Sequence, residues 1–192
     1  SLRYAKTNTL TRPDYSAIIP LYNIDGLSRT VVYRNPFLEA GYSSNNDYVL
    51  SFVNNYLGLL SISYFTKTIS GMIFNSGRRV ASNPSEYGLP GFTYFYMIED
   101  YKTNNPYDVL LNGFEIDYQT RFWYLPKLLR GLVFNCNYTR TSSKVKYPRT
   151  IIDHEIIFEP YLQVTVSNLD TFYVDRLLDQ PKDIINYSIG YD

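Results

Sequence analysis

Cysteine, histidine and net charge are all scarce in this chain of 192 residues. Its single cysteine, Cys136, excludes an internal disulfide framework, and we expect it to act as a small hydrophobic residue rather than a nucleophile. One histidine, His154, is too few for the usual zinc site of a protein. The 18 basic and 18 acidic residues cancel, so no strong field favours binding to nucleic acid.

Long apolar runs and catalytic motifs are also missing. No run of about 18 apolar residues predicts a transmembrane helix, although spanning strands of about 9–11 residues carry only a weak alternating signal. The sequence contains no nucleophile elbow, phosphate-binding loop or metal-ligand motif. We therefore expect no enzymatic activity and no cofactor.

Tyrosine is the abundant residue, with 21 copies beside 11 phenylalanines and one tryptophan. Tyrosine favours strands, and it favours surfaces that are apolar at one end and wet at the other. Carbohydrate-binding proteins, adhesins and outer-membrane barrels share this bias. Composition alone does not choose among them.

The stretch from Gly113 to Tyr138 has the clearest pattern. Side chains alternate between apolar and polar on both sides of a short aromatic-rich connection, residues 123–131, that ends in glycine. A period of two is the signature of a strand, since successive side chains point to opposite faces. The sequence predicts a two-stranded hairpin with one apolar and one polar face. The apolar face is expected to carry Phe114, Ile116, Tyr118, Phe122, Leu132, Phe134, Cys136 and Tyr138.

The same pattern recurs along the chain. Strands are predicted over residues 46–53 and 59–74, joined by a turn at 54–58 whose asparagines and glycine tolerate positive φ. Another strand is predicted over 184–192, and the chain opens in strand-like sequence. Long loops intervene. Within them we expect a short helix after Pro13, a short strand in TYFYMI (93–98) and strand extensions in HEIIFEPYLQVTV (154–166).

Loop lengths favour one all-β architecture over another. Short turns alternate with much longer connections, which is typical of outer-membrane barrels and less so of soluble sandwiches. The short turns also carry aromatic residues (Tyr56 at one, Phe122, Trp123 and Tyr124 at the other), where an interfacial aromatic girdle would lie. The predicted fold is an antiparallel meander of long hairpins that forms part of a transmembrane β-barrel with long external loops.

Several segments resemble a known family. Residues 11–23 (TRPDYSAIIPLYN) with 34–52 (RNPFLEAGYSSNNDYVLSF), then 58–65, 112–118 and 170–192, resemble the C-terminal barrel portion of TonB-dependent outer-membrane receptors of the type common in Bacteroidetes. The sequence departs from the family pattern at Phe37, where an acidic residue is frequent, and at Ala40-Gly41, which replace a commoner Pro-Glu pair.

The resemblance implies a barrel of about 22 strands with an N-terminal plug, located in the cell outer membrane. Such a receptor imports a scarce nutrient: an iron chelate, a cobalamin-like cofactor or a glycan. Its implied partners are outer-membrane lipid, the small nutrient ligand, TonB through the plug, and a surface lipoprotein. We expect residues 1–192 to be one partial barrel segment, with the plug and the final strands absent.

Loop aromatics are the candidate ligand-binding residues. They would stack on a sugar or a siderophore ring, or they would pack the long loop against itself. The candidates are Tyr87, Phe92, Tyr94, Tyr96 and Tyr101.

Charged residues give weaker candidates. Glu115, Asp117 and Arg121 alternate on one strand, which predicts a lumen-facing ladder; a solvated face without specific chemistry is the alternative. The stretch 153–155 (Asp-His-Glu) would touch a chelated metal or form an exposed loop cluster. Arg78-Arg79 would bind an anion or be solvated.

A second function class remains open: a soluble or surface β-sheet module that binds carbohydrate with its tyrosines. The two classes differ in what covers the apolar face. In a sandwich these side chains pack on a second sheet or a helix, whereas in a barrel wall they form an uncovered belt. The residues that decide are Leu60, Ile62, Phe114, Ile116, Leu132 and Phe134.

Overall fold

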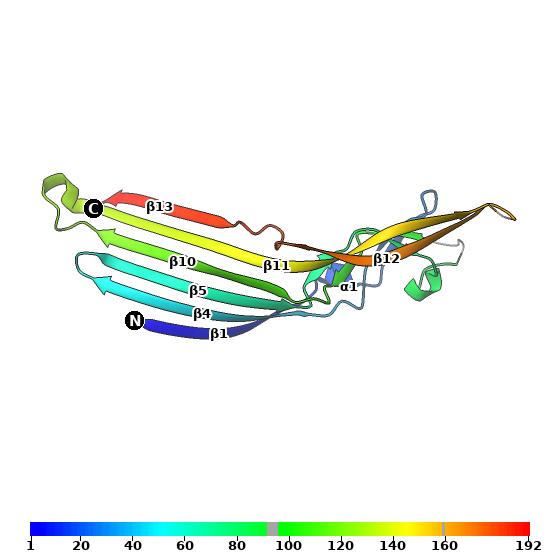
Figure 1. Ribbon diagram of the computed structural model, residues 1–192, viewed down its shortest axis with the longest axis horizontal. Coiled ribbons are helices and arrows are strands. Elements are labelled where there is room, and N and C mark those ends of the chain that lie inside the picture. Colours follow the sequence, from blue (N-terminus) through cyan, green and yellow to red (C-terminus); the bar gives the residue numbers. More distant parts are fainter. Residues whose placement is uncertain (92–95, 159) are drawn as a thin grey trace.

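The computed structural model describes residues 1–91, 96–158 and 160–192, and its architecture is all-β. Its largest element is a seven-stranded antiparallel sheet in the order β1–β4–β5–β10–β11–β12, with β13 also paired to β11 (Figure 1). The strands are β1 (Leu2–Thr11), β4 (Gly41–Asn54), β5 (Gly58–Ser70), β10 (Val109–Arg121), β11 (Leu132–Ile157), β12 (Gln163–Asp175) and β13 (Asp183–Tyr191).

The predicted strands of the large sheet are confirmed, with shifts at their ends. Of the short strand predicted over 93–98, residues 93–95 lie outside the described residues, and a strand runs over Tyr96–Glu99. The strand predicted over 46–53 begins earlier, at Gly41, because its polar residues pair with both neighbours. The strand predicted over 59–74 stops at Ser70, where Gly71 takes a positive φ of 65° and turns the chain. At the turn between β4 and β5, Gly58 has φ 80°, and the Asn54 side chain accepts the amide N–H of Tyr56 at 2.8 Å.

Strand β11 changes partner partway along its length. Its first half, Leu132 to Arg140, pairs with β13, and its second half, Val145 to Ile157, pairs with β12. The β11–β12 hairpin therefore extends past the rest of the sheet and twists as it does so (Figure 1). This confirms the strand extensions expected around residues 154–166.

The long connections fold into small elements beside this hairpin. A four-stranded sheet has the order β2–β3–β8–β7, in which β3 and β8 are parallel; β6 pairs with β9. The expected short helix after Pro13 is α1, and Asp14 caps it by accepting the Ser16 N–H at 2.9 Å. Their bounds are α1 (Tyr15–Ile18), β2 (Tyr22–Asp25), β3 (Thr30–Tyr33), β6 (Ile73–Asn75), β7 (Arg79–Ala81), β8 (Tyr96–Glu99) and β9 (Lys102–Asn104), with the 3-10 helix η1 (Pro84–Tyr87). A second 3-10 helix, η2 (Lys127–Gly131), lies in the short connection between β10 and β11.

The hydrophobic core lies in these connections and at the adjoining end of the large sheet. One cluster of buried residues joins β3, β7 and β8 through Val31, Ala81, Leu89, Tyr96 and Ile98. A second cluster, Val109, Val145 and Tyr147, is packed by Met72 and Phe74. In the part of the chain that the structure describes, no helix is long and apolar enough to cross a membrane.

Candidate functional site

One face of the large sheet carries aligned apolar side chains. The strand register places six of them in a single row across six strands. The row is Leu2, Leu50, Ile62, Ile116, Tyr138 and Ile185. Leu50 is 56% exposed, Ile62 44% and Ile185 66%, although cross-strand neighbours flank them. Cys136 lies on this face too, opposite Tyr118 and Tyr187.

The residues that were to distinguish a sandwich from a barrel wall are uncovered. Leu60 and Phe114 are each 37% exposed, and Ile116, Leu132 and Phe134 are half-buried only by their neighbours in the sheet. Among the described residues, neither a second sheet nor a helix packs on this face of β4, β5 and β10. The apolar face is thus one continuous exposed surface.

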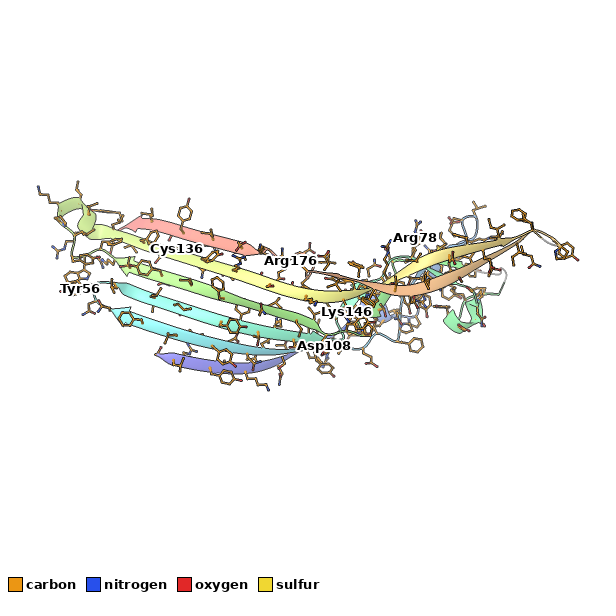
Figure 2. All side chains as sticks on the ribbon, in the orientation of Figure 1. Tyr56, Arg78, Asp108, Cys136, Lys146 and Arg176 are labelled. Carbon is orange, nitrogen blue, oxygen red and sulfur yellow. The ribbon has the colours of Figure 1, made fainter. Side chains whose placement is uncertain are left out.

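Aromatic residues bound this surface at both ends. At one end Tyr4, Tyr48 and Tyr64 lie side by side, with ring centroids 5.1 Å and 6.4 Å apart, and Phe114 follows in the same row. At the other end, by the short turns, Tyr56 packs on Trp123 at 5.3 Å and on Tyr124 at 5.8 Å. The indole Nε1 of Trp123 donates to the Asn55 carbonyl at 2.8 Å. Figure 2 shows Tyr56 at this end of the molecule, far from Arg78 in the connections.

The separation of the two aromatic rows is set by strand geometry. From Phe114 to Arg121, where β10 ends, the chain advances about 23 Å along the strand, and the turn aromatics lie beyond that end. A tilt of about 40°, usual for barrel strands, would reduce this to about 18 Å along the perpendicular, to which the turn aromatics add; the apolar band of outer-membrane barrels is roughly 25 Å tall. The apolar face between the two aromatic rows is thus about one strand length tall.

The opposite face of the same strands is polar. One row on this face joins five strands through Ser51, Ser61, Asp117, Asn137 and Asn186. Asn137 donates to Glu115, and Gln119 Nε2 donates to Asp117 at 3.0 Å. These bonds hold both carboxylates of the predicted charged ladder, while its third member, Arg121, forms an ion pair with Asp192 at 2.9 Å.

The candidate loop aromatics divide into buried and half-buried residues. Tyr96 is only 3% exposed and belongs to the hydrophobic core, so its ring does not reach solvent. Tyr87 and Tyr101 both contact Tyr33, at 5.6 Å edge-on and 6.2 Å stacked. Burial raises the pKa of Tyr33 and of Tyr101. The other two candidates, Phe92 and Tyr94, lie outside the described residues.

Arg79 ties this tyrosine cluster to the β11–β12 hairpin. Its guanidinium donates to both carboxylate oxygens of Asp170, at 3.0 Å and 3.2 Å, and to the Tyr87 hydroxyl at 3.3 Å. Beside it, the Asn168 side chain bonds both the N–H and the C=O of Val80, as a neighbouring strand would. One alternative for Arg79 was an arginine contacted only by solvent, and these contacts show that this alternative is wrong. Its neighbour Arg78 is exposed and pairs with Glu99 at 3.0 Å.

The stretch 153–155 is exposed on the extended hairpin, where the Asp153 carboxylate accepts the His154 backbone N–H at 3.0 Å. Within the described ranges, no group of three or more His, Cys, Asp or Glu side chains has the arrangement of a metal site. Among the residues that the structure describes, this stretch therefore has no further side chains placed to complete a metal site.

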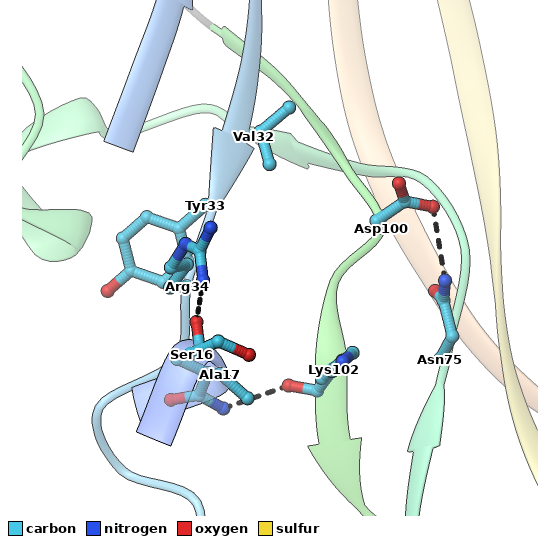
Figure 3. A pocket seen from close by; sticks show the side chains of 9 residues that line it. Ser16, Ala17, Val32, Tyr33, Arg34, Asn75, Asp100 and Lys102 are labelled. Atoms are coloured by element: carbon cyan, nitrogen blue, oxygen red, sulfur yellow. Dashed lines mark hydrogen bonds between the residues drawn. The ribbon is translucent and has the colours of Figure 1, made fainter. Parts of the chain in front are cut away.

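A pocket of about 380 Å³ opens between α1, the end of β3, β6 and the start of β9 (Figure 3). Arg34, half-buried, donates to the Ser16 carbonyl from one wall. Asp100 faces it from the other and accepts from Asn75 Nδ2 at 3.1 Å. Lys102 lies between them, and the Asn35 side chain holds its backbone carbonyl at 3.0 Å.

The sequence did not indicate this pocket. Its residues come from four segments whose proximity depends on the parallel pairing of β3 with β8, which no local pattern reveals. The one local signal was the density of tyrosines nearby, and Tyr33, in the pocket wall, was not among the candidates.

Comparison with known proteins adds no identification. No protein-family model matches the chain, and no curated protein matches it. Function is therefore argued from the geometry described above.

Proposed function

We propose that this chain forms part of the wall and outer loops of a TonB-dependent outer-membrane receptor that imports a scarce nutrient. The observation that carries the proposal is the exposed apolar face, bounded by two aromatic rows and backed by a polar face on the same strands. A barrel wall needs this arrangement, with lipid on one side and a polar lumen on the other.

Energetics support lipid as the missing neighbour. Burying one large apolar side chain is worth roughly 1.5–3 kcal/mol, so a row of such residues facing water would forfeit a large share of a domain's stability. Lipid removes this cost without any further protein layer. In the proposed receptor the sheet continues into neighbouring strands at its edges, which would also pair the free edge of β1.

The connections beyond the sheet fit the outer loops of such a receptor. They hold the hydrophobic core, the tyrosine cluster and the pocket, all at the end of the sheet away from the short turns (Figure 1). On this proposal the protein resides in the outer membrane, its nutrient enters past these loops, and energy arrives from TonB through a plug. A surface lipoprotein is a further proposed partner.

A soluble carbohydrate-binding module is the second candidate, favoured by the tyrosines beside the pocket. It requires a cover for the apolar face, and the described part of the chain provides none.

Two substitutions on adjacent residues of β5 separate the two functions. Leu60 belongs to the apolar face and Ser61 to the polar face, next to Asp117. In the full-length protein, Leu60→Arg places a charge near the middle of the band and should cost roughly 2–4 kcal/mol, whereas Ser61→Arg should be tolerated. The readout is the amount of folded, heat-modifiable protein in the outer-membrane fraction. Equal tolerance of both changes, or recovery of the wild-type protein in the soluble fraction, would overturn the proposal.

A further inference from the structure

The pocket in Figure 3 has an unusual charge balance. Two cationic side chains, Arg34 and Lys102, lie in its wall with one carboxylate, Asp100. Four ion pairs are present among the described residues, and neither Arg34 nor Lys102 belongs to any of them. The pocket wall therefore carries a net positive charge.

Both cations have free hydrogen-bonding capacity. The Arg34 guanidinium donates to the Ser16 carbonyl, which leaves most of its five N–H groups for another acceptor. The Lys102 ammonium has no hydrogen-bond partner in the part of the chain that the structure describes. The nearby Asp14 carboxylate, which both cations influence, accepts the Ser16 N–H and lies outside the pocket lining.

The remaining wall completes a recognisable set of groups. Asp100 already accepts from Asn75, so its second oxygen is suited to accept from a ligand hydroxyl. Val32 and Tyr33 supply an apolar and an aromatic surface. Cations, an acceptor and a ring surface within one concavity match a small hydroxylated molecule that carries an oxyanion.

The scaffold fixes the backbone that carries Lys102 and one hydrogen bond of Arg34. Asn35, only 7% exposed, uses its side chain twice, donating to the Lys102 carbonyl and accepting the Phe37 N–H at 3.0 Å. Asp14 caps the helix whose Ser16 carbonyl accepts from Arg34. The backbone of the site and the Arg34 side chain are thus positioned before a ligand binds.

We infer that this pocket binds the anionic group of a sugar-like ligand, a carboxylate or a phosphate carried on a hydroxylated ring, with Arg34 and Lys102 as its cationic contacts. The inference deepens the proposed function, because it names the chemistry that the outer loops would select. Binding itself does not depend on import.

The test uses the full-length protein purified in detergent and isothermal titration with three probes: glucuronate, glucose 6-phosphate and glucose. We expect at least one of the two anions to bind and glucose not to bind, and the stronger anion identifies carboxylate or phosphate as the preferred group. Lys102→Gln should weaken anion binding about tenfold, since a charge-assisted contact becomes neutral. The matched control is Lys6→Gln, which removes the same charge from β1 and should leave binding unchanged.

Arg34→Lys provides a second variant that keeps the charge but loses the planar fork, and it should weaken binding by a smaller factor. Glucose binding as well as the anions, no binding of either anion to folded protein, or equal effects of Lys102→Gln and Lys6→Gln would each overturn the inference. A protein that binds the anion but leaves the outer-membrane fraction would retain this inference and defeat the proposed function; a correctly inserted protein that binds no anion would do the reverse.

Discussion

Phe65 on β5 lies directly over Gly113 on β10, its register partner. A Cβ built on Gly113 would come within 2.5 Å of the Phe65 ring and 2.5 Å of the Arg140 carbonyl oxygen. The aromatic ring thus covers a glycine on the polar face of the sheet, and the backbone of β11 closes in from the other side. This arrangement leaves room for hydrogen only.

Gly113→Ala should therefore destabilise the folded protein by about 1–3 kcal/mol, the usual cost of overpacking. The measurement is the midpoint of unfolding in guanidinium, monitored by tyrosine and tryptophan fluorescence. Phe65→Leu in the same chain should restore only part of the loss, because the Arg140 carbonyl remains in place. Full restoration would show that the ring alone makes the contact, and no loss in Gly113→Ala would contradict the packing.

The second prediction concerns the Arg79–Asp170 contact between β7 and β12. Because the Asp170 side chain is 61% exposed, solvent screens the pair, and we expect a coupling of roughly 1 kcal/mol rather than more. A double-mutant cycle with Arg79→Gln and Asp170→Asn measures this coupling energy. The readout is hydrogen exchange at the Val80 N–H, which donates to the Asn168 side chain. Arg78→Gln is the control: the Arg78 side chain is 70% exposed and pairs with Glu99 instead, so Val80 protection should not change.

The same contact should respond to acid. Burial raises the pKa of Asp170, but hydrogen bonds from Thr150 and Arg79 and the Arg79 charge outweigh it, and the pKa lies below the ordinary 3.8. The Arg79–Asp170 contact therefore contributes its full stabilisation above pH 3.8, and this stabilisation is lost as the pH falls through the lowered pKa of Asp170 in the folded state. Protection of the Val80 amide, corrected for intrinsic exchange, should drop there in the wild type. Asp170→Asn should lack this step, and an identical step in that variant would assign the acid response to another group.

Trp123 provides a fourth prediction at the other end of the sheet. Its indole bonds the Asn55 carbonyl and its ring packs on Tyr56, so it joins the two short turns. Trp123→Phe keeps a ring and should cost about 1 kcal/mol for the lost hydrogen bond. Trp123→Ala loses the ring as well and should cost about 1 kcal/mol more. Thermal unfolding in detergent measures both, and indistinguishable melting of all three proteins would show that this contact contributes nothing.

Local sequence patterns were enough for the long strands of the large sheet and their short turns, but not for the short strands β2, β3, β6, β7 and β9 within the long connections. Ile62 and Ser63 alternate between faces because a strand imposes a period of two, and Gly58 marks a turn because it adopts positive φ. Neighbouring residues determine both features. For the same reason the apolar face could be identified before its environment was known.

Contacts between distant segments could not be predicted in this way. Arg79 meets Asp170 across 91 residues, and neither residue has a local pattern that points to the other. Tyr96 is a second example. Its aromatic neighbours in the sequence predicted a ligand-binding surface, but the pairing of β8 with β3 and β7 buries its side chain. Burial of a loop aromatic depends on tertiary packing, which composition does not encode.

The change of partner along β11 has a consequence for how the chain tolerates change. The continuous backbone of β11 sets the register of β13 along its first half and of β12 along its second half. A deletion of one residue between Arg140 and Val145 would move the side chains of one half of β11 to the opposite face of the sheet. Either Tyr138 would leave the apolar row, or the hydrogen bonds between Asn168 and Val80 would be lost. Residues 176–182, which connect β12 to β13, are held to the same part of β11 by hydrogen bonds with Thr141, Ser143 and Tyr147, so a change of length there should also be poorly tolerated.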